Sequence, residues 1–430
     1  MRNFIASSSL VTSLLSSSLT MSQVAIPGVK RPAEGSEHQH GSHVECPLPK
    51  SAMDVLQCAM NEHPKVRRAR FTAESTQTLT AVAEKIPNPD LDVESAFGNG
   101  NASSLDIALL QPIEWGGKRS SRIKSANAEI AQMTAQQKEA QAEVVIQTIQ
   151  NLHRLRQLTL ESELHNDTVS TLQKIISQQS ARPALTPEQQ VALSVFRMSL
   201  ADAKIRQSEV FEEEREIEHY FHVSTGHSLD EVRAVLPKSP KAWPEISTQP
   251  ASRGPSPSVA EAIATRDFSE AELSVARAGS WPSLRLGPMI KMGRNREQNE
   301  NLYGFRLMMD LPVFNLNGAG QEHARAGLNK SQQLVSLTKS EEDHERAEQL
   351  KIYRSAVQAL KSAPTLEFIE KDFRKGQTFA RRGIISATLM IEFHRQRLDL
   401  VRSRNGREMK ALQALWLLYK YDSRIFSESI

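Results

Sequence analysis

The sequence lacks the features that would assign it to several common classes of protein. Its 53 Lys and Arg residues are nearly balanced by 50 Asp and Glu residues, so the formal net charge is only +3. A net charge of this size supplies no long-range field that would attract nucleic acid, and we predict no nucleic-acid partner. No stretch approaches the roughly 20 apolar residues that a membrane-spanning helix requires.

Catalytic motifs are also missing. Gly116-Gly117-Lys118 does not have the GxxxxGK[ST] spacing of a phosphate-binding loop, and the sequence has no HExxH motif. His394 follows Glu392 on an expected helix, where a single histidine is more typical of packing than of catalysis. We therefore predict that the protein is not an enzyme and uses no cofactor.

The chain is poor in cysteine, with only Cys46 and Cys58. The two thiols could pair in an oxidising compartment, but the sequence leaves this open. His38, His40, His43 and Cys46 carry groups that bind zinc or copper. Because these residues lie in a Gly- and Ser-containing segment before the first periodic helix, we interpret residues 26–50 as a flexible His-containing linker. Weak metal binding is the alternative.

The N-terminus has some features of an export signal. Arg2 precedes a stretch, residues 4–21, that is apolar but diluted by serines, and small residues follow it. This pattern predicts a signal peptide over residues 1–25, with a serine-rich leader that has no export role as the alternative.

An internal repeat is the strongest pattern in the chain. At an offset of 193 residues, Pro64, Val66, Pro89 and Leu91 match Pro257, Val259, Pro282 and Leu284. At an offset of 200 residues, Pro112, Arg182 and Arg197 match Pro312, Arg382 and Arg397. We interpret residues 51–236 and 258–430 as two tandem repeats, joined by a proline-rich linker at residues 237–257.

Each repeat has the same expected order of elements. In the first, a helical stretch over residues 53–85 precedes two strands, 91–97 and 105–110, in which apolar and polar residues alternate. This predicts β-hairpins at about residues 90–112 and, in the second repeat, 283–312. Residues 119–179 contain neither proline nor glycine and could form a helix of roughly 90 Å. Pro183 and Pro187, and then Gly383, mark places where the long helices fold back. The expected fold is mainly α with a small β portion.

Two groups of motifs resemble the TolC family of outer membrane factors. The first comprises Asn88-Pro89-Asp90-Leu91 and the run from Gln111-Pro112-Ile113-Glu114-Trp115 through Gly116-Gly117-Lys118-Arg119. The second comprises Trp281-Pro282-Ser283-Leu284, Leu311-Pro312-Val313-Phe314 and Arg382-Gly383-Ile384-Ile385-Ser386. The resemblance covers roughly residues 50–425 and is closest to the heavy-metal and cation efflux branch.

The resemblance implies a homotrimer with a membrane β-barrel of twelve strands above an α-helical barrel of coiled-coil helices. It implies a location in the outer membrane, with a large periplasmic portion, and a passive channel in a tripartite efflux system that exports metal cations or small toxic compounds. The implied partners are outer membrane lipid, a periplasmic adaptor (membrane fusion protein) and an inner-membrane pump of the resistance–nodulation–division type. The alternatives are a TolC-like channel for type I protein secretion and, in a different class, a soluble periplasmic coiled-coil scaffold.

Two sets of site residues follow from these expectations. The apolar positions of the strands should face lipid: Leu105, Ile107, Leu109, Phe305, Leu307 and Met309. By the resemblance, the tips of the helical hairpins should dock the adaptor: Arg182, Pro183, Thr186, Arg382, Gly383 and Ser386. Plain hairpin turns with no docking role are the alternative for the tips.

Overall fold

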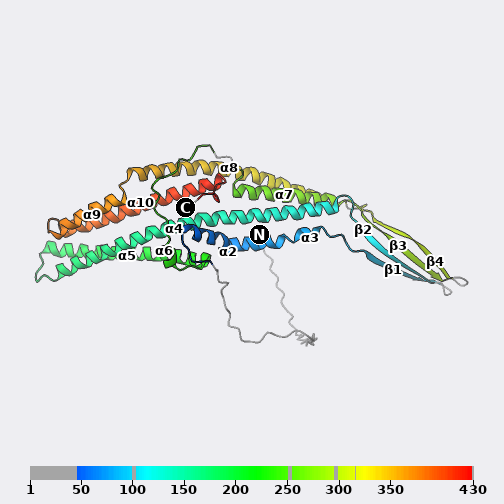
Figure 1. Ribbon diagram of the computed structural model, residues 1–430, viewed down its shortest axis with the longest axis horizontal. Coiled ribbons are helices and arrows are strands. Elements are labelled where there is room, and N and C mark those ends of the chain that lie inside the picture. The colour runs from blue at the N-terminus through cyan, green and yellow to red at the C-terminus, as the bar shows by residue number, and fades with distance from the viewer. Residues whose placement is uncertain (1–45, 99–102, 250–253, 295–298, 315, 429–430) are drawn as a thin grey trace, which may run out of the picture. The chain divides into compact units, whose positions relative to one another are not determined.

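A computed structural model describes residues 46–98, 103–249, 254–294, 299–314 and 316–428. These residues belong to one unit of helices with a small β-sheet (Figure 1). None of the helices that the structure describes combines the length and apolar character needed to cross a membrane. The expected signal peptide (residues 1–25), and His38, His40 and His43, lie outside the described residues.

The first helical stretch is divided into three helices: α1 (Ala52–Glu62), α2 (Pro64–Thr76) and α3 (Leu79–Ala83). The expected helical stretch over residues 53–85 is therefore helical over most of its length but divided into three pieces. Pro64 occupies the first turn of α2, where its missing N–H is harmless, but a proline there cannot continue α1. Ser51 caps α1 by accepting a hydrogen bond from the backbone N–H of Asp54 at 3.3 Å.

A long helical hairpin follows the first pair of strands. Helix α4 (Lys118–Ser180) runs for 63 residues without interruption, as the absence of proline and glycine predicted. Residues 181–186 form the turn, and α5 (Pro187–Thr225) returns alongside α4, followed by the short α6 (Leu229–Arg233). Thr186 and Gln189 form a capping box that fixes where α5 begins.

The second set of helices is interrupted at a different place from the first. It comprises α7 (Pro257–Ala278), α8 (Gly318–Ser362), α9 (Leu366–Arg381) and α10 (Ala387–Tyr421). Pro364 separates α8 from α9, and Thr365 caps α9. The Arg404 guanidinium of α10 donates to the carbonyls of Leu360 at 3.4 Å and Pro364 at 3.3 Å, so it binds both sides of the interruption.

The sheet contains β1 (Asp90–Phe97), β2 (Ser103–Ile113), β3 (Ser283–Arg294) and β4 (Asn299–Asp310). All neighbours are antiparallel and the order is β1-β2-β3-β4, so β1 and β4 form the edges. Both expected hairpins are present, and the strands are longer than the alternation indicated. The strand expected over residues 105–110 extends past Pro112, which lies within β2 opposite Arg285.

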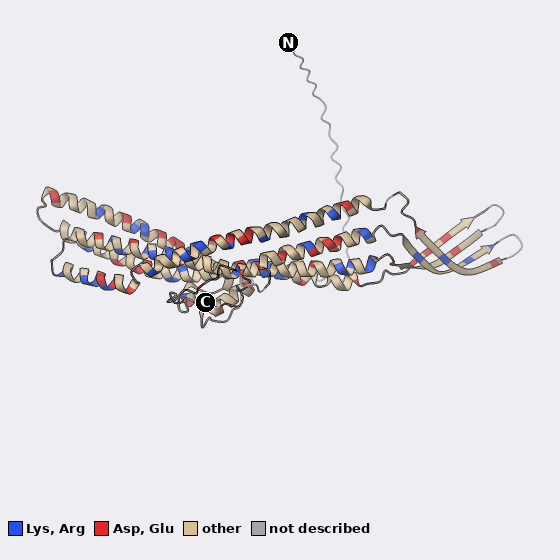
Figure 2. Ribbon diagram, turned by 90° about the horizontal axis from the view of Figure 1, so that it is seen from above, with Lys and Arg blue, Asp and Glu red and all other residues tan. Residues whose placement is uncertain are grey.

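The main core lies where α1, α4, α8 and α10 meet. Leu56, Ile149, Tyr353 and Leu418 are buried there together with small residues such as Ala411. Alanines allow neighbouring helices to approach closely, and the larger side chains fill the remaining space. The helices thereby form a packed body from which the strands extend at one end, while the turns at residues 181–186 and 382–386 lie at the other (Figures 1 and 2).

The expected linker has no helix or strand between α6 and residue 249. It is nevertheless bonded to the helices. The hydroxyl of Tyr353 donates to the carbonyl of Pro244 at 2.6 Å, and Trp243 packs edge-on against the same tyrosine ring. The bounds of the two repeats and of the linker stay a prediction.

Candidate functional site

The two faces of the sheet differ sharply in chemistry. Cross-strand pairing places Val93 beside Ile107, Ile107 beside Ile290, and Leu286 beside Leu307. Since side chains alternate between faces, these pairs share one apolar face. All six residues predicted to face lipid lie on it: Leu105, Ile107, Leu109, Phe305, Leu307 and Met309.

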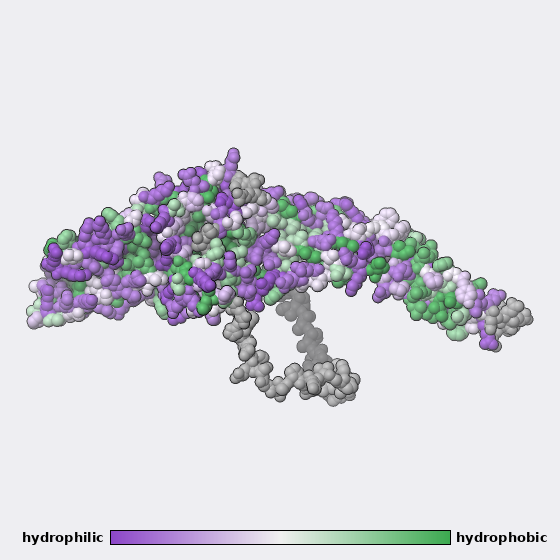
Figure 3. All heavy atoms as spheres, in the orientation of Figure 1, coloured by the Kyte–Doolittle hydropathy of each residue, from purple (hydrophilic) through white to green (hydrophobic). Residues whose placement is uncertain are grey.

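The apolar face is uncovered. Phe305 is 80% exposed and Leu307 is 61% exposed, values that are unusual for large apolar side chains in a folded unit. Figure 3 shows hydrophobic residues gathered over the strands close to the helix ends. An exposed apolar face of this kind requires either a protein partner or lipid.

The opposite face carries a network of charged residues that the sequence analysis missed. Asp106 on β2 lies 3.3 Å from the ammonium of Lys291 on β3 and 3.5 Å from the guanidinium of Arg306 on β4. Arg306 also bonds Asp92 on β1. Ala108 pairs with Asp92 across β1 and β2 and lies on the same face as Asp106, two residues further along β2. The alternation of apolar and polar residues in the sequence marks these positions as polar. The ion pairs, however, depend on how strands about 200 residues apart are aligned in the sheet.

The two edge strands make backbone hydrogen bonds on one side only. Among the described residues, β1 pairs only with β2, and β4 pairs only with β3. Exposed edges of this length are a template for another strand. A sheet with an apolar face and two open edges is suited to closure by further copies of itself.

The predicted tip residues lie in the turns at the end of the unit opposite the sheet (Figure 1). Arg182, Pro183, Thr186, Arg382, Gly383 and Ser386 are all exposed. Gly383 adopts a φ of +72°, and its N–H donates to the carbonyl of Ala380 at 3.0 Å. Thr186 and Ser386 both cap the returning helix, so the two turns end alike although Pro183 and Gly383 differ.

A cleft of about 280 Å³ lies between the two helical hairpins, and Leu172, Met198, Ile391 and Leu398 line its apolar part. Charged residues surround it: Arg206 lies 3.1 Å from Asp202 on its own helix and 3.4 Å from Asp399 on α10. Glu392, near the second tip, accepts two hydrogen bonds from Arg395, which lower the pKa of its carboxyl to about 2. This cleft could not be predicted from the sequence, because its lining comes from α4, α5 and α10, which lie far apart along the chain.

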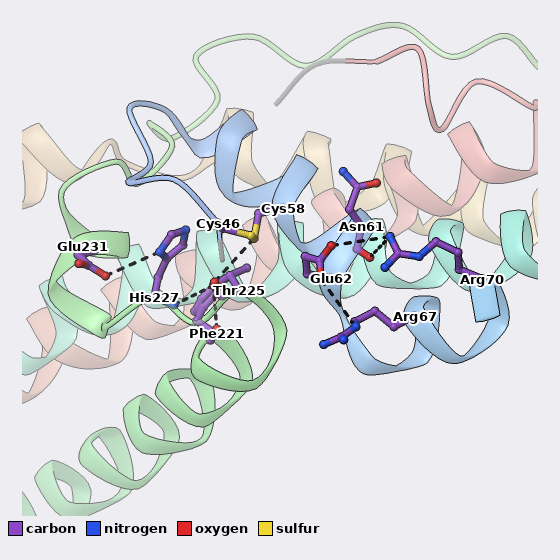
Figure 4. Close-up of a disulfide and its surroundings, with 10 residues drawn as sticks. All are labelled: Cys46, Cys58, Asn61, Glu62, Arg67, Arg70, Phe221, Thr225, His227 and Glu231. Carbon is purple, nitrogen blue, oxygen red and sulfur yellow. Dashed lines mark hydrogen bonds and ion pairs between the residues drawn. A yellow bond between two sulfur atoms is a disulfide. The ribbon is translucent and has the colours of Figure 1, made fainter. Parts of the chain in front are cut away.

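The two cysteines, whose pairing the sequence left open, form a disulfide (Figure 4). The bond joins the segment before α1 to α1 itself, and the Cys58 sulfur lies 3.8 Å from the carbonyl oxygen of Thr225 at the end of α5. In this state Cys46 is not a thiolate and cannot act as a metal ligand. Within the described ranges, no group of three or more His, Cys, Asp or Glu residues is arranged to hold a metal ion.

Comparison with solved structures identifies the fold. No family model and no curated protein matches the sequence. The Campylobacter jejuni CmeC outer membrane channel has a TM-score of 0.67 and 12% identity, covering 94% of this chain and 96% of that one. The open state of the Neisseria gonorrhoeae MtrE outer membrane channel has a TM-score of 0.65 and 13% identity, covering 87% and 89%. CusC, whose structures are described for conformational changes accompanying folding and transmembrane channel formation, has a TM-score of 0.59 and 14% identity. The match covers 90% of this chain and 98% of CusC.

The similarity extends over nearly the full length of these channels and includes both the helices and the sheet. The chain therefore has the TolC-like fold, and the predicted fold class is confirmed. At identities of 12–14%, this similarity shows the fold alone.

Proposed function

We propose that this chain is one subunit of a homotrimeric channel in the outer membrane, a passive conduit with no catalytic role. The observation that carries the proposal is the four-stranded sheet, which has one exposed apolar face, one charged face and two open edges. Three copies, each pairing β4 with β1 of the next, would close a ring of twelve strands. The apolar faces would then contact lipid, and the Asp106 and Arg306 network would face the water-filled lumen.

The other end of the unit supports a role in a tripartite efflux system. Helix α4 extends away from the sheet for roughly 95 Å at 1.5 Å per residue, a length suited to crossing the periplasm. The exposed turns at residues 181–186 and 382–386 would dock a periplasmic adaptor, which connects the channel to an inner-membrane pump of the resistance–nodulation–division type. CmeC and MtrE, with the same fold, are themselves outer membrane channels.

The disulfide is consistent with this location, because a Cys46–Cys58 bond persists in the oxidising periplasm and not in a reducing cytoplasm. For the exported material, metal cations and small toxic compounds are the proposed classes, and heavy metal resistance is the corresponding phenotype. The motif resemblance to the cation efflux branch supports the metal class.

The test places arginine on each face of the sheet. The double variant Ile107→Arg/Leu307→Arg puts two charges on the apolar face, at roughly 2–4 kcal/mol each near the middle of a bilayer. We expect it to eliminate the heat-modifiable trimer from outer membrane fractions. The control Ala96→Arg places the same side chain on the charged face, near the end of β1, and should leave trimer yield unchanged.

Recovery of the wild-type protein as a soluble monomer would contradict the proposal. Normal trimer yield from Ile107→Arg/Leu307→Arg would contradict the assignment of the apolar face to lipid.

A further inference from the structure

The boundary between the helices and the sheet is held by two tryptophans, one from each repeat. The rings of Trp115 and Trp281 meet edge-on with centroids 5.5 Å apart, and the indole N–H of Trp115 donates to the carbonyl of Pro282 at 2.5 Å. Gly116 makes this contact possible, since a Cβ atom there would lie 2.1 Å from Cγ of Trp281. Trp281 remains 49% exposed.

Exposed apolar residues continue from the sheet past this boundary. In the segment between β4 and α8, Leu311 is 65% exposed, Val313 72%, and Phe314 fully exposed. The side chain of Asn317 donates to the carbonyl of Ala276 at 2.9 Å, which holds the end of the segment against α7. The apolar surface of the sheet therefore extends to the level of the helix ends.

Basic residues surround the same level. The Lys118 ammonium lies 3.4 Å from the carbonyl oxygen of Pro282, beside the tryptophan pair. Arg119 donates to the carbonyl of Glu84, which holds the end of α3 and with it Lys85 against the start of α4. Lys85 and Arg277 are exposed. Figure 2 shows Lys and Arg segments at helix ends next to the strands.

We propose that this boundary belt binds the headgroups of anionic phospholipids, in the membrane leaflet nearer the helices. Its basic residues are Lys85, Lys118 and Arg277, and its aromatic and apolar residues are Trp115, Trp281, Leu311, Val313, Phe314 and Leu316. The inference rests on the proposed membrane location and adds a lipid class to it. Tryptophan rings settle at headgroup level, apolar side chains enter the acyl region below, and Lys and Arg attract anionic headgroups.

The experiment uses the full-length protein reconstituted into phosphatidylcholine vesicles with and without phosphatidylglycerol. Thermal dissociation of the trimer is measured in both. Phosphatidylglycerol should slow thermal dissociation of the wild-type trimer on the order of tenfold, because each basic side chain near an anionic surface contributes a few-fold. The variant Lys85→Gln/Lys118→Gln/Arg277→Gln should lose this difference while still inserting into both vesicles.

The matched control Lys339→Gln/Lys361→Gln/Lys371→Gln removes the same charge from helix surfaces outside the belt and should behave as the wild type. Inorganic phosphate added to phosphatidylcholine vesicles should not stabilise the trimer, since the belt requires a headgroup at a membrane surface. Phospholipids that carry bromine close to the headgroup should quench the tryptophan fluorescence of the wild type. This quenching should be weaker in Trp281→Phe.

Equal trimer stability in the two vesicle types would overturn the lipid inference and leave the channel proposal standing. Equal loss of the phosphatidylglycerol effect in the control variant would also overturn it, because the effect would then reflect net charge alone. Failure of the wild type to insert into either vesicle would contradict the proposed function itself.

Discussion

The guanidinium of Arg346 on α8 and the carboxylate of Asp422, just after α10, form a buried bidentate pair with N···O distances of 2.7 and 3.1 Å. Arg346 also donates to the carbonyls of Ser247, Thr248 and Gln249. One side chain thus joins the second long helix, the C-terminal segment and the linker. A buried charge pair with these additional hydrogen bonds is strongly destabilised when one partner is removed.

Arg346→Met should therefore lower the free energy of unfolding by about 3–5 kcal/mol, measured by urea denaturation, because Asp422 is left buried without a counter-charge. Arg354→Met is the control. Arg354 lies on the same helix and bonds the same linker through Ile246 and Thr248, but it is exposed. Its loss should change stability by no more than about 1 kcal/mol. Equal effects of the two substitutions would show that the buried pair has no special role.

Reduction of the disulfide should destabilise the attachment of the N-terminal segment to α1. The bond closes a short loop with a sequence separation of 12, for which loop-closure entropy gives about 2–3 kcal/mol. Dithiothreitol should lower the unfolding midpoint of the wild type and leave that of Cys46→Ser/Cys58→Ala unchanged. A wild-type midpoint indifferent to reductant would contradict a stabilising role for the bond.

His153 on α4 should make stability fall in mild acid. Burial, with a smaller contribution from nearby Arg156, lowers the pKa of its imidazole to about 3. The unfolded chain therefore takes up a proton below the ordinary pKa of about 6.5 while the folded chain does not. The free energy of unfolding is therefore highest above pH 6.5. It should fall by about 1.4 kcal/mol for each pH unit as the pH decreases from 6.5 towards 3.

The comparison of His153→Leu with the wild type isolates this histidine from others that are also buried. The variant should show a shallower decline of the urea midpoint between pH 7 and pH 4.5. His344→Leu, at an exposed position on α8, should keep the wild-type slope. The idea fails if the His153 and His344 variants have the same pH dependence.

Two helical glycines near the second hairpin should respond to alanine in opposite directions. A Cβ atom on Gly376 of α9 would lie 2.1 Å from the Phe393 ring of α10, whereas one on Gly406 would meet nothing within 4 Å. Gly376→Ala should destabilise by about 1–3 kcal/mol through overpacking. Gly406→Ala should stabilise by about 0.5–1 kcal/mol, because alanine is the better helix former. Thermal unfolding of both variants gives the comparison, and destabilisation of equal size in both would contradict the packing difference.

The sequence was informative where structure depends on local pattern. Alternation of apolar and polar residues predicted that Ile107 and Leu307 each lie on the apolar face of a strand. The absence of proline and glycine predicted the long α4. The sequence did not predict that Pro64 divides the expected helical stretch into α1 and α2. It also could not reveal Arg306 bonding Asp92, or Arg206 beside Asp399, because those contacts arise from the packing of segments about 200 residues apart.

The interruption at Pro364 makes the two helical hairpins mechanically unequal. A bending force at the turn of residues 181–186 is carried along one continuous run of backbone hydrogen bonds in α4. A force at residues 382–386 is carried by two helices, of which α10 is continuous and α9 is separated from α8 by a gap, where Arg404 of α10 bonds both sides. Behind the second turn, one of the two load paths is therefore broken at Pro364, and the remaining load there falls on α10.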